Sequence, residues 1–386
     1  MTHITLDSIA KSLKCLQVAA VSFALLVTCG PDRDTRARLL FNQGVQAFRE
    51  GNFRECVDLN TRAIELYGCY ADAYVNRSGA WFNLGELDKA LKDCDSALDC
   101  RPNHAAAYAM RGRIQVAAGD NQAAVHDLSV ALSANEDDAD LLQLRATALS
   151  AVGRHEQALK DWGQVVSLRP QQAWPYVGRA EAFFYLGRHR DAARECGKAL
   201  AIDSQAVTAY ALRGASRLSM GLHEQAFSDF RAALSLEPNH ALTHMYRGIA
   251  HFNAGTYDKA VEDFDRALAQ RINPALVHCY RGAAYYNQGN IARAMADYDT
   301  ALAMAPSLPE PRIFRAILFQ GLQRHEQARE DLTEAIRLDS TNAQAFRLRA
   351  DSYQALDSME RACSDREKAS ARAGDSAQSS FILGLD

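Results

Sequence analysis

The chain repeats itself every 34 residues, and this periodicity constrains the fold more than any other feature of the sequence. Cutting the chain at Ala37, and every 34 residues after it, gives ten segments that end at residue 376 without any insertion. A chain of 386 residues without repeats would be interpreted as two or three globular domains. A unit of this length cannot bury its apolar face alone, so neighbouring units must stack. The periodicity therefore predicts a solenoid.

The positions of the repeat, numbered 1 to 34, predict a pair of helices in each unit. Positions 8, 20 and 27 are small in almost every repeat, which lets two helix backbones approach closely. Position 15 is glycine from Gly51 to Gly289, and glycine suits the left-handed residue that ends a helix. Position 32 is proline in four repeats, where it stops the second helix. Each unit is predicted to be a helix of about 13 residues, a tight turn, a second helix and a short loop.

One stretch carries a family resemblance. Residues 280–289, followed by Ala294, Tyr298, Ala301 and Pro306, resemble the tetratricopeptide repeat nearly position for position, and the likeness extends over residues 37–376. The resemblance implies an all-α fold, a right-handed superhelical solenoid of ten 34-residue helix-turn-helix repeats. It also implies that the first helices line a concave face and the second helices a convex face.

An arginine at position 7 and an acid at position 23 occur together in nine repeats, and the first repeat has neither. Joint presence and absence predicts a partly buried Arg–carboxylate bridge between the two helices. The alternative is a ladder of arginines that grips a polyanion, although each arginine already has its acid. The arginines are Arg77, Arg111, Arg145, Arg179, Arg213, Arg247, Arg281, Arg315 and Arg349; the acids are Asp93, Asp127, Asp161, Glu195, Asp229, Asp263, Asp297, Asp331 and Asp365.

The resemblance places a ligand groove on the first helices, at positions 2, 5, 9, 12 and 13. These spacings of three and four put the side chains on one helical face. Asparagine there suits the backbone of an extended peptide or helix, and aromatic rings suit its side chains. The alternative is that a neighbouring repeat or the chain's own tail covers this face. The predicted binding residues are Trp174, Val177, Phe184, Tyr185, Met245, Ile249, Phe252, Asn253, Tyr286, Asn287, Ile313 and Ile317.

The main site is expected between repeats five and nine, because repeats three and four are smaller and more polar at these positions. No Ser-His-Asp arrangement, glycine-rich phosphate loop or H-E-x-x-H motif is found, so we expect no enzyme and no cofactor. An activity built in the groove is the remote alternative. The histidines at position 17 are expected to pack at helix starts rather than bind a metal. The nine cysteines show neither C-x-x-C pairing nor the pattern of a disulfide scaffold.

With 43 basic and 47 acidic residues, the chain has no basic stripe for nucleic acid. The expected partners are therefore one or more proteins. The sequence predicts a non-enzymatic scaffold or adaptor that binds a peptide or helix of its partner in the concave groove.

The two ends carry the predictions on localisation. Residues 1–28 have the basic and apolar regions of a signal peptide, followed by a short linker over residues 29–36. Leu26-Val-Thr-Cys29 resembles the lipobox of bacterial lipoproteins, which would make Cys29 the lipidated residue and the only link to a membrane. We expect a lipid-anchored or periplasmic protein of the bacterial envelope; the alternatives are another secreted form or a cytoplasmic adaptor similar to co-chaperones. Residues 377–386 are expected to be a C-terminal tail.

Overall fold

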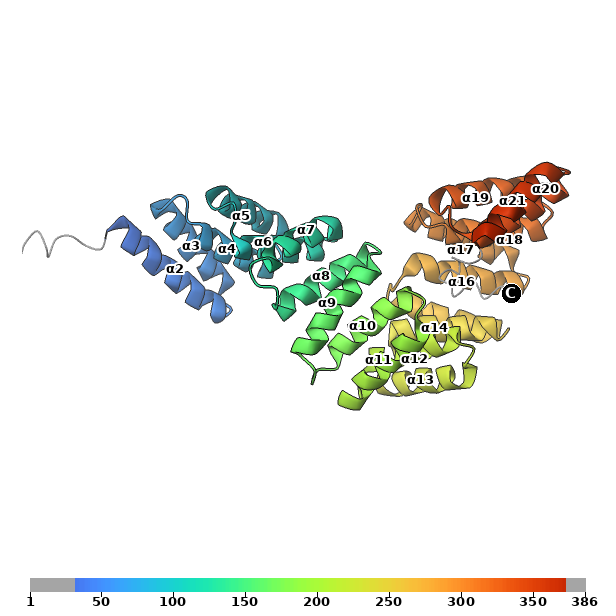
Figure 1. Cartoon of the computed structure of the whole chain (residues 1–386), viewed down its shortest axis with the longest axis horizontal. Coiled ribbons are helices and arrows are strands. Elements are labelled where there is room, and N and C mark those ends of the chain that lie inside the picture. Colours follow the sequence, from blue (N-terminus) through green and yellow to red (C-terminus); the bar gives the residue numbers. More distant parts are fainter. Residues whose placement is uncertain (1–31, 373–386) are drawn as a thin grey trace, which may run out of the picture. The chain divides into compact units, whose positions relative to one another are not determined.

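The computed structural model describes residues 32–372, which form twenty helices and two compact units (Figure 1). Unit 1 extends to Val152 and unit 2 begins at Gly153. The leader, Cys29, and the tail from residue 373 lie outside the described residues. Within residues 32–372, no helix has both the length and the hydropathy needed to cross a membrane.

The helices follow one another in antiparallel pairs, one pair for each repeat. Unit 1 contains α2 (Arg33–Arg49), α3 (Phe53–Leu66), α4 (Ala71–Asn83), α5 (Leu87–Cys100), α6 (Ala105–Ala118), α7 (Asn121–Leu132) and α8 (Ala139–Ala151). Unit 2 contains α9 (His155–Leu168), α10 (Trp174–Tyr185), α11 (His189–Ile202), α12 (Val207–Ser219), α13 (His223–Leu236), α14 (Ala241–Asn253), α15 (Tyr257–Ala269), α16 (Pro274–Asn287), α17 (Ile291–Met304), α18 (Glu310–Gly321), α19 (His325–Leu338), α20 (Ala343–Ala355) and α21 (Met359–Arg372).

The predicted all-α repeat architecture is confirmed, and so is its turn chemistry. Every glycine at position 15, from Gly51 to Gly289, has a positive φ between 69° and 84°. Gln323 and Asp357 occupy the same position in the last two repeats and keep the left-handed conformation, at φ 61° and 57°. The turn therefore imposes this conformation even where glycine is absent. At the other end, α2 begins at Arg33, so residues 33–36 of the predicted linker are helical.

Small and large residues complement each other between the two helices of a repeat. A Cβ atom added to Gly214 would lie 2.5 Å from the ring of Phe230, and one added to Gly248 would lie 2.6 Å from Phe264. Both rings are fully buried. Glycine at position 8 therefore makes room for an aromatic ring at position 24, which fixes how the two helices pack.

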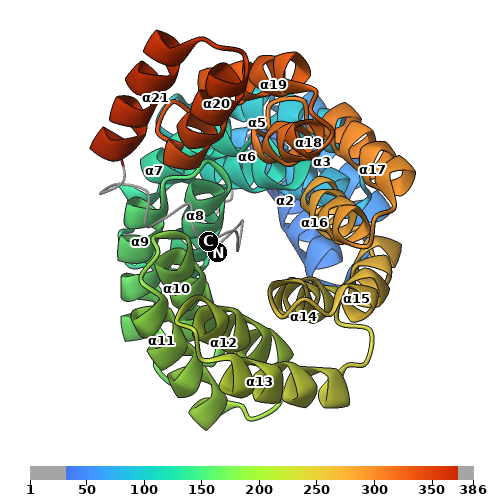
Figure 2. The ribbon, with the colours of Figure 1, turned by 90° about the vertical axis from the view of Figure 1, so that its right-hand side faces the viewer.

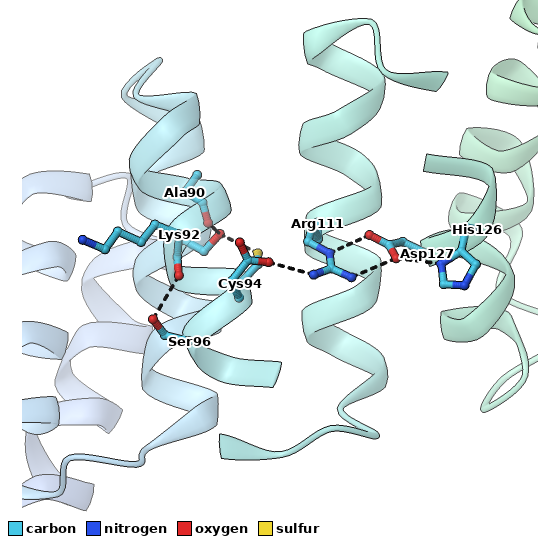
Figure 3. A network of polar contacts seen from close by, with 9 residues as sticks. Ala90, Lys92, Cys94, Ser96, Arg111, His126 and Asp127 are labelled. Atoms are coloured by element: carbon cyan, nitrogen blue, oxygen red, sulfur yellow. Dashed lines mark hydrogen bonds and ion pairs between the residues drawn. The ribbon is translucent and has the colours of Figure 1, made fainter. Parts of the chain in front are cut away.

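The predicted ion pair is confirmed in eight repeats. Arg Nε and Nη2 donate to the acid of the same repeat, for example to Asp127 from Arg111 at 2.6 and 3.0 Å (Figure 3). The acid side chains are 3–11% exposed and the arginines 12–24%. This geometry is that of a structural clamp rather than of a polyanion ladder. Arg145 and Asp161 belong to different units, so their pairing stays a prediction.

The third arginine nitrogen makes a contact that the sequence analysis missed. Arg111 Nη1 donates to Asp95 of the preceding repeat at 2.7 Å, and Arg315 Nη1 donates to Asp299 at 2.7 Å. In the repeat before Arg213, position 25 is Gly197, which has no side chain to accept this bond. One arginine can thus bind two repeats together, and it does so only where position 25 carries an oxygen.

The first helices lie on the inner side of the stack in each unit. Contacts between alternate helices join first helix to first helix, from α2 to α8 in unit 1 and from α10 to α20 in unit 2. In unit 2, α10, α12, α14 and α16 lie inside α11, α13, α15 and α17 (Figure 2). Positions 2, 5, 9 and 12 are on these inner helices, so their side-chain sizes decide whether the inner face is filled or open.

Candidate functional site

The structure separates the predicted groove residues of unit 2 by burial. Five are buried, with exposed fractions of 0–6%, and belong to one apolar core that extends over the unit. Four are partly buried, and three are exposed. The buried residues are Phe184, Met245, Ile249, Phe252 and Ile313; the partly buried ones are Trp174, Val177, Tyr286 and Ile317; the exposed ones are Tyr185, Asn253 and Asn287.

Aromatic contacts explain the buried set. The Phe252 ring lies 5.7 Å from Tyr257 of the following helix and 6.1 Å from Tyr280 of the next repeat. The Phe184 ring lies 5.9 Å from Tyr246, two repeats further along. These side chains are enclosed by neighbouring repeats, as the alternative interpretation of the sequence stated, so their effect on any ligand is indirect.

Three of the accessible residues at these positions, Trp174, Tyr185 and Asn287, already have partners. Trp174 Nε1 donates to Gln172 at 2.7 Å, and the Tyr185 ring stacks on His155 at 4.9 Å. Asn287 Nδ2 donates to the carbonyl of Ala283 in its own helix at 2.9 Å. The inner face of unit 2 therefore presents scattered accessible groups, with its large side chains turned into the core.

A cavity lies instead on the inner face of unit 1, across the first three repeats. Its volume is about 450 Å³. It lies on α2, α4 and α6, at the groove positions that the sequence analysis applied to unit 2. Its lining residues are Phe41, Val45, Phe48, Asp72, Val75, Asn76, Gly79, His104, Ala106, Ala109, Met110 and Arg113.

Small residues create this cavity. Gly79, Ala106 and Ala109 lie at groove positions 9, 2 and 5, where unit 2 carries residues such as Ile249, Leu242 and Met245. Small side chains at these positions led the sequence analysis away from the N-terminal repeats. They are the signal that could have located the cavity.

Asn76 and Arg113 are polar residues of the cavity whose side-chain donors lack a protein partner among the described residues. Asn76 Nδ2 is buried and has no hydrogen-bond acceptor. Arg113 is exposed and forms no ion pair within residues 32–372, although its repeat also contains the fully paired Arg111. Both groups are hydrogen-bond donors, so the cavity offers donors to an incoming acceptor.

Asp72 and His104, which also line the cavity, belong to a group of polar contacts. Asp72 lies 3.2 Å from Arg101 Nη2 and 3.1 Å from His104 Nε2. Burial lowers the pKa of His104, against the opposing effect of Asp72. Arg101 and Asp72 are 54% and 40% exposed in their side chains, so this ion pair contributes little to stability.

A disulfide lies beside these contacts. Cys69, in the α3–α4 loop, is bonded to Cys100, the last residue of α5, with their Cα atoms 5.3 Å apart. The sequence analysis foresaw no disulfide framework, and this single bridge does not make one. The 31-residue separation is one repeat less three residues, which becomes a short distance only when successive repeats stack.

The other cysteines of residues 32–372 are thiols, and all but Cys363 are buried. Burial raises the pKa of Cys56 to about 11 and of Cys94 to about 12. Burial also raises the pKa of Cys196 to about 12. These thiols are therefore protonated and shielded at neutral pH, unlike those of reactive cysteines.

The histidines support the packing interpretation. Those at position 17 are the first residues of α9, α11, α13 and α19. His244 and His278, at position 4, bond through Nδ1 to the acids of the Arg–acid pairs, Asp263 and Asp297, at 2.8 and 2.7 Å. No group of three or more potential metal ligands occurs in the described part of the chain.

Comparison with protein families agrees with this architecture. Residues 41–105, 109–175, 211–277 and 247–309 match the model described as tetratricopeptide repeat. The chain belongs to the tetratricopeptide-repeat family. Repeat scaffolds of this kind are typical of protein and peptide binding and are generally non-enzymatic.

Solved structures share the fold at low identity. The Cut9–Hcn1 hetero-tetramer of APC/C has a TM-score of 0.54 at 12% identity, over 92% of this chain and 90% of that one. The human IFIT1 dimer with m7Gppp-AAAA has a TM-score of 0.54 at 14% identity, over 88% of this chain and 90% of that one. YrrB, described as a TPR protein with an unusual peptide-binding site, has a TM-score of 0.44 at 23% identity and matches 48% of this chain and 95% of its own. For the two structures with a TM-score of 0.54, the likeness at these identities concerns the fold alone.

Proposed function

We propose that this tetratricopeptide-repeat protein is a scaffold that holds a peptide segment of a partner protein in the cavity of unit 1. The observation that supports it is a 450 Å³ space on the inner face, lined by the groove positions of three successive repeats. A space of this size accommodates a bulky side chain with its flanking backbone.

The lining defines the occupant. Phe41, Phe48 and Met110 supply an apolar wall, while Asn76 and Arg113 supply donors without acceptors. We propose an extended segment that inserts a large apolar side chain and places a carboxylate next to Arg113. The aromatic and methionine walls adapt to different apolar side chains, and the charge selects against a basic neighbour.

Filling the cavity tests the location of the site. Ala106→Trp places an indole in the space, whereas Thr208→Trp places it at the same repeat position in repeat six, where Thr208 is exposed. Binding is measured by fluorescence anisotropy with labelled ten-residue peptide pools that have Phe-Asp or Phe-Lys at the centre. We expect Ala106→Trp to weaken Phe-Asp binding at least tenfold, about 1.4 kcal/mol, and Thr208→Trp to leave it unchanged. Equal binding by both variants would place the site elsewhere.

Reversing the charge tests the chemistry. Arg113→Glu is expected to abolish the preference for the Phe-Asp pool without a change in melting temperature, because Arg113 has no ion pair to lose among the described residues. Arg190→Glu is the matched control, since Arg190 of unit 2 is also exposed and forms no ion pair within residues 32–372. A preference for Phe-Asp that survives in Arg113→Glu would remove the carboxylate from the proposal.

We further propose that the scaffold is tethered to the bacterial envelope through a lipid on Cys29. The bonded Cys69–Cys100 pair supports an oxidising compartment, where disulfides persist. The buried thiols Cys56 and Cys94 are compatible with it, because burial protects them from oxidation. The mass of the N-terminal peptide from the native host is expected to show a diacyl or triacyl group on Cys29. An unprocessed Met1 would instead favour the cytoplasmic adaptor.

A further inference from the structure

The Cys69–Cys100 bridge is an exception to the repeat. Cysteine occupies position 33 only in the first repeat and position 30 only in the second. The bridge therefore does not arise from the shared pattern that builds the solenoid. It is a local feature of unit 1, the unit that contains the cavity.

The bridge connects two segments that form one end of the cavity. Cys69 lies in the α3–α4 loop, three residues before Asp72, and Cys100 lies at the end of α5, four residues before His104. Asp72 and His104 both line the cavity. We call residues 69–72 and 100–104 the cavity rim. A covalent link between the two halves of the rim holds this wall of the cavity in place.

The same loop also positions an apolar wall. The Tyr70 ring, adjacent to Cys69, lies 5.1 Å from the ring of Phe41 on α2 and 5.8 Å from Tyr67. Phe41 lines the cavity from the first repeat. Movement of the loop would therefore shift both the polar end of the cavity and one of its aromatic residues.

Besides the disulfide, an apolar cluster that contains Ala71 and partly buried Cys100 joins the two halves of the rim, together with two polar contacts. The Arg101–Asp72 pair is exposed, and exposed pairs contribute little. The His104–Asp72 contact depends on the protonation of a histidine whose pKa burial lowers. The disulfide is the covalent link between the two halves of the rim. It is also accessible, because Cys69 is exposed and Cys100 is only partly buried.

We propose that the Cys69–Cys100 disulfide is a redox control of the unit 1 cavity, which binds its peptide tightly when the bond is formed and weakly when it is reduced. A protein or small-molecule dithiol supplies two electrons and two protons: the S–S bond breaks, Cys69 and Cys100 become thiols, and the dithiol becomes a disulfide. The released loop then frees the rim. This inference rests on the proposed function of the cavity.

The test compares the oxidised and reduced full chain. Affinity for the Phe-Asp peptide pool is measured before and after treatment with dithiothreitol, and alkylation with mass spectrometry verifies which cysteines are reduced. We expect reduction to weaken binding about tenfold and to speed amide exchange in residues 67–72 and 100–105. The Cys69→Ser/Cys100→Ser variant should bind weakly in both conditions, while Cys363→Ser, which removes the exposed thiol of unit 2, should respond like the wild type.

The outcomes separate the two proposals. Equal affinity and equal exchange in fully oxidised and fully reduced protein would overturn the redox control and leave the cavity as the binding site. No binding in either state would overturn the proposed function and this inference with it. A Cys69→Ser/Cys100→Ser variant that binds as tightly as the oxidised wild type, with an unchanged melting temperature, would also contradict the proposed redox control.

Discussion

The two units use the same repeat and the same inner positions, yet one inner face is open and the other is filled. At position 12, Phe48 of unit 1 is partly buried and borders the cavity, whereas Phe252 of unit 2 is 5% exposed and lies in the core. At position 5, Ala109 of unit 1 stands where unit 2 has Met245 and Ile313, both buried. The difference is one of side-chain volume at equivalent backbone positions.

This difference shows how a solenoid acquires a site. Large apolar residues on an inner helix reach the adjacent repeats and are covered by them, so they stabilise the stack. Small residues leave space that the backbone cannot close, because the neighbouring helices already pack through positions 8, 20 and 27. A site thus requires a local deficit of volume, with polar groups such as Asn76 and Arg113 at its border.

The largest expected effect contrasts the two phenylalanines. Phe252→Ala should destabilise unit 2 by about 3–5 kcal/mol, because it leaves a void in a closed core. Phe48→Ala should destabilise unit 1 by only about 1–2 kcal/mol, since its ring is only partly buried, and should weaken peptide binding. Amide exchange in urea, followed separately in each unit, measures both losses. Equal destabilisation of the two units would break the contrast.

The Arg–acid clamps should show a smaller contrast. Arg111→Ala removes both the bond to buried Asp127 and the bridge to Asp95, so we expect a loss of about 3 kcal/mol in unit 1. Arg213→Ala should cost less, because Arg217 Nη1 still donates to Asp229 at 2.6 Å and no inter-repeat bridge is lost. Denaturant-induced unfolding of the two single variants measures the loss of free energy of unfolding in each. A larger loss for Arg213→Ala would mean that the inter-repeat bridge contributes nothing.

The smallest expected effect is a difference in acid sensitivity. Burial lowers the histidine pKa at one described position of unit 1, His104, and at four of unit 2: His155, His189, His240 and His251. A lowered pKa means that the folded state resists protonation. Its contribution is therefore present above the ordinary histidine pKa of about 6.5 and is lost as the pH falls below it.

Acidification from pH 7.5 to 5.5 should consequently lower amide protection in unit 2 more than in unit 1. Two of the clamped carboxylates, Asp127 and Asp263, have lowered pKa values and do not interfere in this range. The hydrogen bonds from His244 and Arg247 outweigh the effect of burial and lower the pKa of Asp263, so its contribution is lost only below about pH 4. Amide exchange rates, corrected for the effect of pH on intrinsic exchange, check this comparison between the units. A greater loss of protection in unit 1 would contradict it.

The repeat register predicted most of the fold, because its determinants are local or lie within one hairpin. Glycine at position 15 imposes the turn, Pro238 follows the end of α13, and Arg213 meets Asp229 across a single pair of helices. Contacts between repeats were harder to predict. The bond from Arg111 to Asp95 and the Cys69–Cys100 bridge both join residues of successive repeats.

The groove positions of the repeat were predicted from the sequence, and the binding residues predicted in repeats five to nine stay a prediction. Residues at the groove positions line the cavity, whereas the predicted binding residues include large ones such as Phe184 and Ile313, which neighbouring repeats cover. Exposure of an inner residue depends on how closely successive first helices approach, and that distance is set by residues of several repeats together. The residues at a single repeat position therefore do not determine this distance.

The most direct test of the account is to map where a bound peptide protects the full chain. Hydrogen exchange is measured with and without a saturating Phe-Asp peptide, under oxidising conditions. The account predicts new protection in residues 41–48, 72–79 and 104–113 of unit 1, with little change over residues 242–253 and 276–287 of unit 2. Protection confined to those segments of unit 2 would contradict the central claim. It would place the binding site at the predicted groove residues of repeats five to nine.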